Sequence, residues 1–298
     1  MALDWINIQR QLKELGHYPG LIDGIAGPLT KAAVRAFQKT AKLVVDGVVG
    51  PKTLAALETA RPDPDYSVSV AAELIDLAYM IKKNGLESVN KTLKSKHKVR
   101  VEKSCPVKGV EAYMLSNKCL LIPGSNSIWD YLKFNFRLLN LGMPKLKLLA
   151  RQQNQKDNNG KTVRGKSGIV WHQGFFTHAN HINSWIGSDP SNWPRLIVGH
   201  SLGAASAQIL STIWSAPSIG FAAPRIRKSS VPPQFENKSL SICRKDDIVG
   251  RLPRGFDRMG QTSILVHRAR KFGLNHKMAA YIDAMQNTDS EIPAYWNP

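Results

Sequence analysis

The sequence contains few cysteines and no long apolar run. Only three of its 298 residues are cysteine, namely Cys105, Cys119 and Cys243. No two of them form a C-x-x-C pair, so neither a disulfide framework nor a structural zinc site is expected. No window approaches the roughly 20 apolar residues that cross a bilayer. The opening stretch, MALDWINIQRQLKEL, lacks the apolar core of a secretory signal peptide. We therefore expect a protein made in the cytoplasm without a Sec signal, which needs another route if it leaves the cytosol.

Acidic residues are scarce as well. The chain has 22 Asp and Glu against 41 Lys and Arg, which gives a formal net charge of +19. Residues 1–65 hold 8 basic and 7 acidic residues, a balance of +1, so residues 66–298 carry the remaining +18. Such an excess favours polyanionic partners, such as an anionic membrane surface, phosphate-bearing wall polymers or nucleic acid. Because no zinc-finger, RNP or basic-zipper motif is present, no specific nucleic-acid partner is expected.

One turn motif occurs twice near the start of the chain. Residues 23–30 read DGIAGPLT, and residues 46–53 read DGVVGPKT. Asp-Gly favours a tight turn with positive φ, Gly-Pro favours a second bend, and Thr30 or Thr53 can cap the helix that follows. Helical spacing in INIQRQLKELG, TKAAVRAFQKTA and TLAALETA completes the pattern. It predicts a small three-helix domain over residues 1–62.

This domain resembles the peptidoglycan-binding domain type 1 family, whose pattern is a helix, D-G-x-x-G-x-x-T, an A-V-x-x-F-Q helix and the same turn again. The resemblance covers nearly all of residues 5–58. It implies a module that binds peptidoglycan and has no catalytic activity of its own. Asp23 and Asp46 are the candidate peptidoglycan contacts, although an Asp at this position also serves the turn. A linker at 63–69 is expected to separate this domain from the larger domain at 70–298.

The larger domain is interpreted around residues 196–210, LIVGHSLGAASAQIL. An apolar run typical of a buried parallel strand breaks at Gly-His-Ser-Leu-Gly and resumes with small residues at helical spacing. A G-x-S-x-G turn of this kind presents its serine between a strand and a helix. Gly199, His200 and Gly203 form the predicted nucleophile elbow, and Ser201 is the candidate nucleophile. The motif alone leaves open a serine that only occupies the turn.

Two further strand-like runs follow, in PSIGFAAPRI and KSLSICRKDDIVGRLP. An α/β-hydrolase places its acid in the loop after such a strand and its histidine later in the chain. Asp246 and Asp247 occupy that loop, and His267 and His276 lie downstream. The order of the motifs predicts an α/β fold of the α/β-hydrolase type, with a mostly parallel sheet.

GHSLGAA, GFAAPRI and DDIVGRLP together resemble the class 3 lipase family of α/β-hydrolases, as do KCLLIPGSNSIWDYL and VWHQGFFTHANHI upstream. The resemblance covers about residues 70–286. It implies a serine esterase with a Ser–His–Asp triad and no cofactor. It selects Asp247 over Asp246 as the acid. It favours His276, which precedes a helix with a tyrosine, over His267 as the general base.

The resemblance also implies the position of the oxyanion hole. The backbone N–H of Leu202, directly after the nucleophile, is one expected donor. The N–H of Ser125 is the other, and its hydroxyl can add a third. Pro123 stands where the family usually has Arg, so the support of this loop must come from elsewhere.

Three histidines, His172, His178 and His181, have the spacing H-x5-H-x2-H, which could hold a metal. Their segment aligns with the family's V-H-x-G-F motif, which carries no metal, so structural roles are favoured and no metal site is predicted. Residues 133–166 hold nine Lys or Arg and one Asp, with Phe and Leu among the cations. A basic amphipathic lid facing an anionic membrane and an ordinary helix followed by a polar loop both fit this segment.

Together these features predict a cell-wall-targeted lipase or phospholipase A-type enzyme. Its substrates would be carboxylic esters of bacterial envelope lipids. It would act in the periplasm, either as an antibacterial effector with an immunity protein as partner or as a phage lysis enzyme. Two alternatives stay open, namely an esterase on wall-linked acyl groups and a non-catalytic wall-binding protein with an inactive hydrolase fold.

Overall fold

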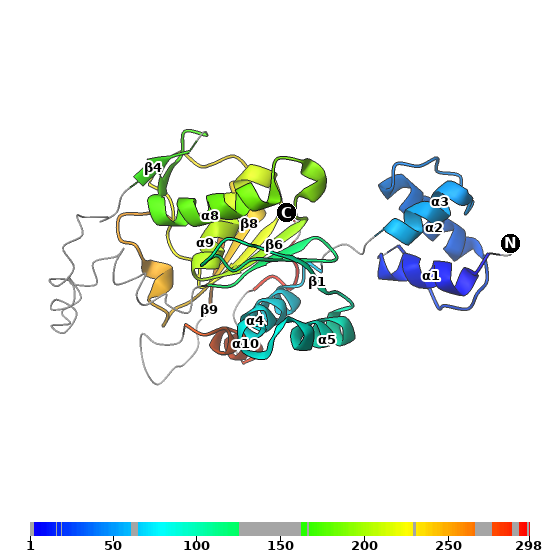
Figure 1. Cartoon of the computed structure of the whole chain (residues 1–298), viewed down its shortest axis with the longest axis horizontal. Coiled ribbons are helices and arrows are strands. Elements are labelled where there is room, and N and C mark those ends of the chain that lie inside the picture. Colours follow the sequence, from blue (N-terminus) through cyan, green and yellow to red (C-terminus); the bar gives the residue numbers. More distant parts are fainter. Residues whose placement is uncertain are drawn as a thin grey trace. The chain divides into compact units, whose positions relative to one another are not determined.

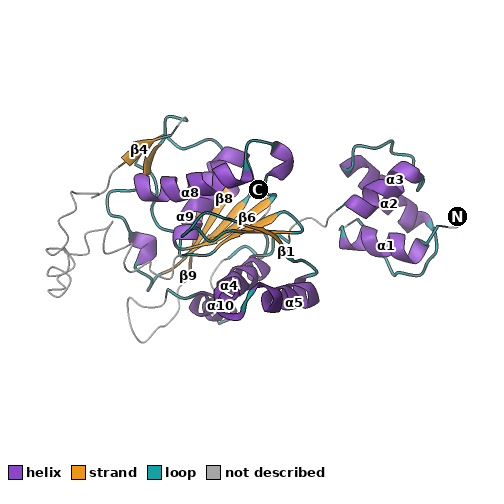
Figure 2. Ribbon diagram, viewed as in Figure 1, coloured by secondary structure: helices purple, strands orange, loops and turns teal. Residues whose placement is uncertain are grey.

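The protein is described here by a computed structural model. It covers residues 3–15, 17–18, 20–60, 65–124, 162–165, 167–228, 231–265, 276–287, 292–296 and 298. The chain forms two compact units, Met1–Pro64 and Asp65–Pro298, whose helices and strands are drawn in Figures 1 and 2. Each unit has a hydrophobic core of its own.

The first unit is built from helices α1 (Trp5–Glu14), α2 (Pro28–Thr40) and α3 (Pro51–Thr59). Its core consists of apolar side chains spaced along one face of each helix, including Leu12, Phe37 and Leu57. The predicted small helical domain is therefore confirmed.

The starts of α2 and α3 differ from the prediction that threonines cap them. Both helices begin at a proline, with Gly27 and Gly50 as the N-cap residues. Proline suits the first helical position because its φ is already helical and its missing N–H is not needed there. Thr30 instead lies inside α2, where its hydroxyl donates a hydrogen bond to the carbonyl of Ile25 at 2.8 Å. The threonine thus fastens the preceding turn to the helix.

The second unit contains a seven-stranded sheet with the order β1-β2-β3-β6-β7-β8-β9. Its strands are β1 (Val101–Ser104), β2 (Tyr113–Leu115), β3 (Cys119–Ile122), β6 (Leu196–His200), β7 (Ser218–Phe221), β8 (Ser239–Arg244) and β9 (Gln261–Leu265). The strands from β3 to β9 are parallel, while β1 and β2 pair antiparallel at one edge. The predicted fold class, with a mostly parallel sheet, is confirmed. A separate two-stranded sheet pairs β4 (Thr162–Arg164) with β5 (Val170–His172).

Helices cover both faces of the large sheet, as Figure 1 shows. On one face lie α8 (Gln173–Ile186) and α9 (Leu202–Trp214), and on the other lie α4 (Val68–Asn84), α5 (Leu86–His97) and α10 (Met278–Gln286). Three short 3-10 helices are also described, η2 (Pro190–Asn192), η3 (Glu236–Lys238) and η4 (Val249–Arg251). Among the described residues, no helix combines the length and apolar character that crossing a bilayer requires.

The alternation of side chains along each strand divides the core into two layers. Leu121 and Val198 pack with the layer under α4 and α10. Their neighbours Ile122 and Ile197 pack with the layer under α8 and α9. Because both faces are covered, the strand Leu196–His200 is buried at every position, as expected for a central parallel strand.

The second unit begins before position 70. The Ser67 side chain accepts a hydrogen bond from the N–H of Val70 and so caps α4. The N–H of Val68 donates to the carbonyl of Ala294 at 3.0 Å. Residues 65–69, the second part of the expected linker, therefore lie in the second unit.

Candidate active site

Ser201 lies at the turn between β6 and α9, with φ 60° and ψ −120°. Its N–H donates to the carbonyl of Phe221 at 2.9 Å, which ties the turn to β7. A Cβ atom at Gly199 would lie 2.3 Å from the carbonyl oxygen of Gly203, and one at Gly203 would lie 1.8 Å from that of Ile122. Both positions therefore require glycine for the strand and helix to approach this closely.

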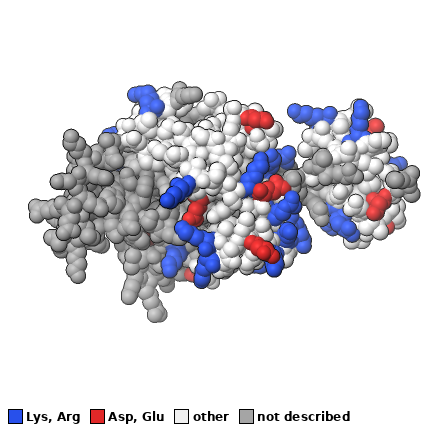
Figure 3. Space-filling model, viewed as in Figure 1, with Lys and Arg blue, Asp and Glu red and all other residues white. Residues whose placement is uncertain are grey.

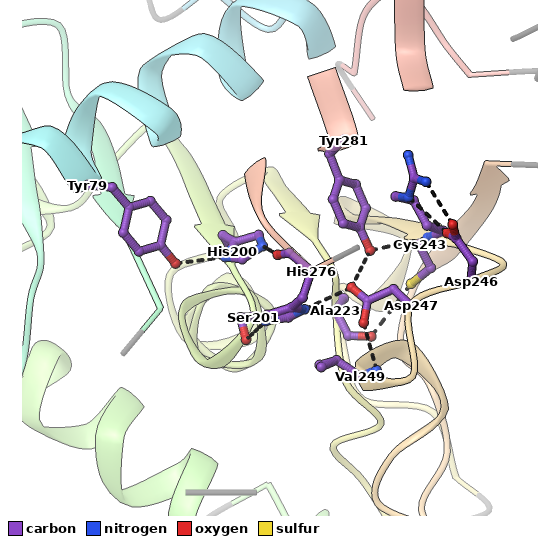
Figure 4. Close-up of polar contacts among 11 residues, drawn as sticks. Tyr79, His200, Ser201, Ala223, Cys243, Asp246, Asp247, Val249, His276 and Tyr281 are labelled. Carbon is purple, nitrogen blue, oxygen red and sulfur yellow. Dashed lines mark hydrogen bonds and ion pairs between the residues drawn. The ribbon is translucent and has the colours of Figure 1, made fainter. Parts of the chain in front are cut away.

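Two segments distant in sequence bring His276 and Asp247 to this serine, as Figure 4 shows. His276 Nε2 lies 2.8 Å from Ser201 Oγ, and His276 Nδ1 lies 2.8 Å from Asp247 Oδ2. An ionised carboxylate can only accept, so Nδ1 carries the proton it donates to Asp247. In the neutral ring Nε2 is then an acceptor for the serine hydroxyl. The three side chains thus have the relation of a nucleophile, a base and a group that orients the base.

The carboxylate of Asp247 is buried and receives further donors. Oδ2 also accepts from the Tyr281 hydroxyl at 2.9 Å, and Oδ1 accepts from the N–H of Val249 at 2.9 Å. Burial by itself raises the pKa of Asp247, but the hydrogen bonds and charge of His276, with these two donors, bring its pKa below the ordinary value. Burial and the adjacent carboxylate raise the pKa of Tyr281. Asp247 is therefore an anion at neutral pH, and Tyr281 is a neutral donor.

The neighbouring Asp246 has a different partner. Its two carboxylate oxygens accept from Arg244 Nε at 2.9 Å and Nη2 at 2.8 Å. Asp247, and not Asp246, is the aspartate that the structure places beside His276. Asp246 is thus bound by Arg244, whereas Asp247 is bound by His276.

The expected oxyanion donors belong to the start of α9 and to the chain that follows β3. Leu202 is the first residue of α9, where a backbone N–H has no carbonyl one turn earlier to bind and the helix dipole is positive. β3 runs parallel to β6 with Ile122 opposite Gly199, so the chain leaving β3 begins next to the elbow. Ser125 itself lies outside the described residues, as does the alternative base His267.

Two tyrosines contact this site although the sequence analysis assigned them no role. Tyr281 comes from α10, the helix whose tyrosine was noted without a function. Tyr79 comes from α4, and its hydroxyl lies 2.7 Å from Nδ1 of His200, 121 residues further along the chain. No local pattern marks Tyr79, because its partners are assembled only by the fold.

The three histidines considered for a metal occupy different environments. Burial lowers the pKa of His172 to about 4. Nδ1 of His178 forms a 2.7 Å hydrogen bond with Ser206 Oγ, and burial lowers the pKa of this histidine to about 4 as well. His181 is exposed on α8, where it lines a groove of about 420 Å³ that includes no residue of the Ser201 site. The basic segment 133–166 lies mostly outside the described residues, apart from the short strand β4 and Gly165.

In the first unit, Asp23 and Asp46 hold their turns in the same way. The Asp23 carboxylate accepts from Gln9 Nε2 at 2.8 Å and from the N–H of Ile25 at 2.9 Å. The Asp46 carboxylate accepts from Gln38 Nε2 at 2.7 Å and from a backbone N–H two residues on at 2.8 Å. These hydrogen bonds lower the pKa of both aspartates. Contact of either residue with peptidoglycan stays a prediction.

Comparison with known proteins identifies the first unit. Residues 2–57 match the family model described as "Putative peptidoglycan binding domain", so this part of the chain is a peptidoglycan-binding domain, as its motifs predicted. No curated protein matches the chain.

Solved structures similar to this chain include three lipases. The Rhizomucor miehei lipase in its propeptide complex is 15% identical with a TM-score of 0.47, and the match covers 68% of each chain. Lipase II from Rhizopus niveus is 14% identical with a TM-score of 0.46, over 67% of this chain and 78% of the other. Lip2 lipase from Yarrowia lipolytica is 13% identical with a TM-score of 0.46, over 73% of this chain and 87% of the other.

Proposed function

We propose that the second unit is a serine carboxylic-ester hydrolase of the lipase or phospholipase A type, directed to the bacterial envelope by the peptidoglycan-binding domain. The observation that carries this proposal is the hydrogen-bonded series from Ser201 Oγ through His276 to Asp247, with 2.8 Å at each step. A serine, a base and an acid at these distances support nucleophilic acyl transfer.

In this mechanism His276 Nε2 takes the proton of Ser201 Oγ while that oxygen bonds to the ester carbonyl carbon. Negative charge moves to the carbonyl oxygen, where the N–H of Leu202 and that of Ser125 would stabilise it by about 3 kcal/mol each. Asp247 stabilises the imidazolium that forms. Collapse of the tetrahedral intermediate expels the alcohol, which receives its proton from His276. A water molecule, deprotonated by His276, then cleaves the acyl–serine ester.

The charge around the site supports an anionic phospholipid surface as the place of action. Lys82 and Lys83 are exposed in the last turn of α4, four residues or fewer beyond Tyr79. Lys245 is exposed directly after β8, and Lys277 directly after His276. These cations therefore lie at the same edge of the sheet as Ser201. Lys82 pairs with Glu111 at 3.1 Å. On the face drawn in Figure 3, Lys and Arg are more prominent than Asp and Glu. A cation near an anionic membrane contributes about 1 kcal/mol to binding.

An enzyme that joins peptidoglycan binding to hydrolysis of membrane lipid would damage the envelope from its periplasmic side. This combination supports a role as an antibacterial effector, with an immunity protein protecting the producing cell, or as a phage lysis enzyme. Export of the protein to the periplasm of a Gram-negative host should arrest growth, whereas the exported Ser201→Ala variant should not. Equal growth with both proteins would contradict the proposed role.

The catalytic proposal is tested with Ser201→Ala in the full chain. Hydrolysis of a short-chain nitrophenyl ester should fall by several orders of magnitude, because no acyl-enzyme can form. The variant should fold, and it should still sediment with purified sacculi through the first unit. Full activity of Ser201→Ala would reduce Ser201 to a turn residue, and failure of the wild type to sediment would remove the wall-targeting half of the proposal.

The choice of lipid is tested with vesicles. Hydrolysis of phosphatidylglycerol vesicles should exceed that of zwitterionic vesicles at low salt, and the preference should shrink at about 0.5 M salt, where the Debye length is about 4 Å. Replacing Lys83, Lys245 and Lys277 by Gln should lower affinity for anionic vesicles by up to about 100-fold. The matched control replaces the exposed lysines 94, 96 and 98 at the end of α5. Equal losses in the two triple variants would refute a local effect at the Ser201 edge.

A further inference from the structure

A series of partly buried hydrogen bonds lies beside Ser201, on the side away from Asp247. The N–H of Gly124, at the end of β3, lies 2.6 Å from Tyr79 Oη. Tyr79 Oη lies 2.7 Å from His200 Nδ1, and His200 Nε2 lies 2.8 Å from the backbone oxygen of His276. Figure 4 shows Tyr79 and His200 in this arrangement next to the nucleophile. The series joins α4, the loop after β3, the elbow and the segment of His276.

The direction of every hydrogen bond in the series follows from the chemistry of its two ends. The backbone N–H of Gly124 can only donate, and the backbone oxygen of His276 can only accept. His200 Nε2 must therefore carry a proton. Burial, followed by the charge of His276, lowers the pKa of His200 to about 3, so the ring is neutral at working pH and Nδ1 is an acceptor. Tyr79 then donates to His200 and accepts from Gly124, and burial raises its pKa, which keeps its hydroxyl protonated.

The series touches the reacting groups at both ends. A Cβ atom at Gly124 would lie 2.8 Å from Tyr79 Oη, 2.9 Å from the carbonyl oxygen of His200 and 2.9 Å from Ser201 Cβ. The backbone at Gly124 is thus packed directly against the nucleophile. At the other end, the carbonyl of His276 belongs to the residue whose ring meets Ser201 Oγ. Asp247 fixes the ring of His276, and His200 fixes its backbone.

We propose that Tyr79 and His200 are positioning residues, which hold the backbone at Gly124 and the backbone of His276 at fixed places on two sides of Ser201. This inference rests on the proposed esterase function. Neither side chain exchanges a proton with the substrate. Their effect is on the placement of the base and of the loop beside the nucleophile, where a displacement of about 1 Å can lower the rate about 100-fold.

The test is Tyr79→Phe in the full chain, assayed with a soluble short-chain ester. The change leaves the N–H of Gly124 and Nδ1 of His200 without the hydroxyl that joins them. We expect kcat per active site, counted by titration with a fluorophosphonate, to fall about 10- to 100-fold while KM changes little. The control is Tyr113→Phe on β2, a buried tyrosine whose hydroxyl makes no hydrogen bond with the described residues. It should keep kcat within about twofold, because loss of this hydroxyl removes no hydrogen bond of the Ser201 site.

A residue with a merely structural role would give a different result. It would lower the melting temperature and leave kcat per titrated site unchanged, and that outcome for Tyr79→Phe overturns the proposal. If Tyr79→Phe fails to fold, His200→Asn serves instead, because it keeps an acceptor near Tyr79 and loses the donor to His276. A reduced kcat at unchanged KM in this variant supports the proposal. Failure of both variants to fold overturns it in favour of a structural role. Activity that survives in Ser201→Ala would instead contradict the proposed function itself.

Discussion

The two units bury polar side chains in different ways. In the first unit one arrangement occurs twice, since Gln9 and Gln38 each bind the aspartate, the backbone and the threonine of a following turn. These contacts span 8 to 21 residues of chain. In the second unit a single arrangement joins residues 29 to 121 positions apart. The polar contacts of the first unit thus join residues close in sequence, whereas those of the second unit form only when the complete sheet brings distant residues together.

The two units should differ most in their response to removal of the proposed general base, His276. His276→Ala should lower esterase activity by about 10⁴- to 10⁶-fold, because neither Ser201 nor water can then lose its proton to a base. Sedimentation with sacculi should be unchanged, since it belongs to the first unit. The assay compares hydrolysis and sedimentation on the same preparation. His267→Ala is the control and should keep most activity, and the reverse result would move the base to His267.

Stability should also respond differently to a single methyl group in the two units. Gly203→Ala places a Cβ atom 1.8 Å from the backbone oxygen of Ile122, so we expect a loss of more than about 4 kcal/mol or failure of the second unit to fold. Gly50→Ala in the first unit meets nothing within 4 Å and should cost less than about 1 kcal/mol. Thermal denaturation followed by calorimetry measures both. A mild effect of Gly203→Ala would mean that the strand and helix can separate at the elbow.

The two copies in the first unit should not be equally sensitive. Gln9 Oε1 accepts from the N–H groups of Asp23 and Gly24, whereas Gln38 Oε1 accepts from that of Gly47. Gln9→Ala should therefore destabilise the first unit by about 2–4 kcal/mol, and Gln38→Ala by somewhat less, because fewer backbone N–H groups lose a partner. Both variants should weaken sedimentation with sacculi and keep esterase activity. Loss of activity in either would show that the units depend on each other.

The smallest expected difference is in sensitivity to acid. His172, His178 and His200 have pKa values of about 4, 4 and 3 in the folded protein, below the ordinary 6.5. Between these values the unfolded chain binds more protons than the folded one, so the second unit should lose stability as pH falls from about 6.5 towards 4. In the first unit the lowered pKa values of Asp23 and Asp46 add stability that is lost only below about 3.8. Calorimetry across this range should show the second unit weakening first, and parallel shifts would contradict this.

The sequence predicts contacts between residues close in the chain better than contacts between distant residues. The paired turns, the helices around them and the elbow at Ser201 are visible in the sequence because each is marked by a short motif of adjacent residues. The prediction that threonines cap α2 and α3 was wrong, because both helices begin at a proline that follows a glycine N-cap. Asp247 and His276 were selected through a family pattern, and the structure places His276 beside Ser201 and Asp247 beside His276. Tyr79 could not be found, because a helix far upstream supplies it and only the packed sheet brings it to His200. Ser125 and His267 stay predictions, since the described residues do not include them.

The backbone of Ser201 has a consequence for the evolution of this chain. A residue other than glycine at φ 60° and ψ −120° raises the free energy of the folded state by about 1–3 kcal/mol. Selection for thermal stability alone would therefore favour replacement of this serine by glycine. The resulting variants would be more stable but would lack the proposed nucleophile. Under the proposed function only selection for turnover would oppose this replacement, so directed evolution of the chain for stability needs an activity screen in every round.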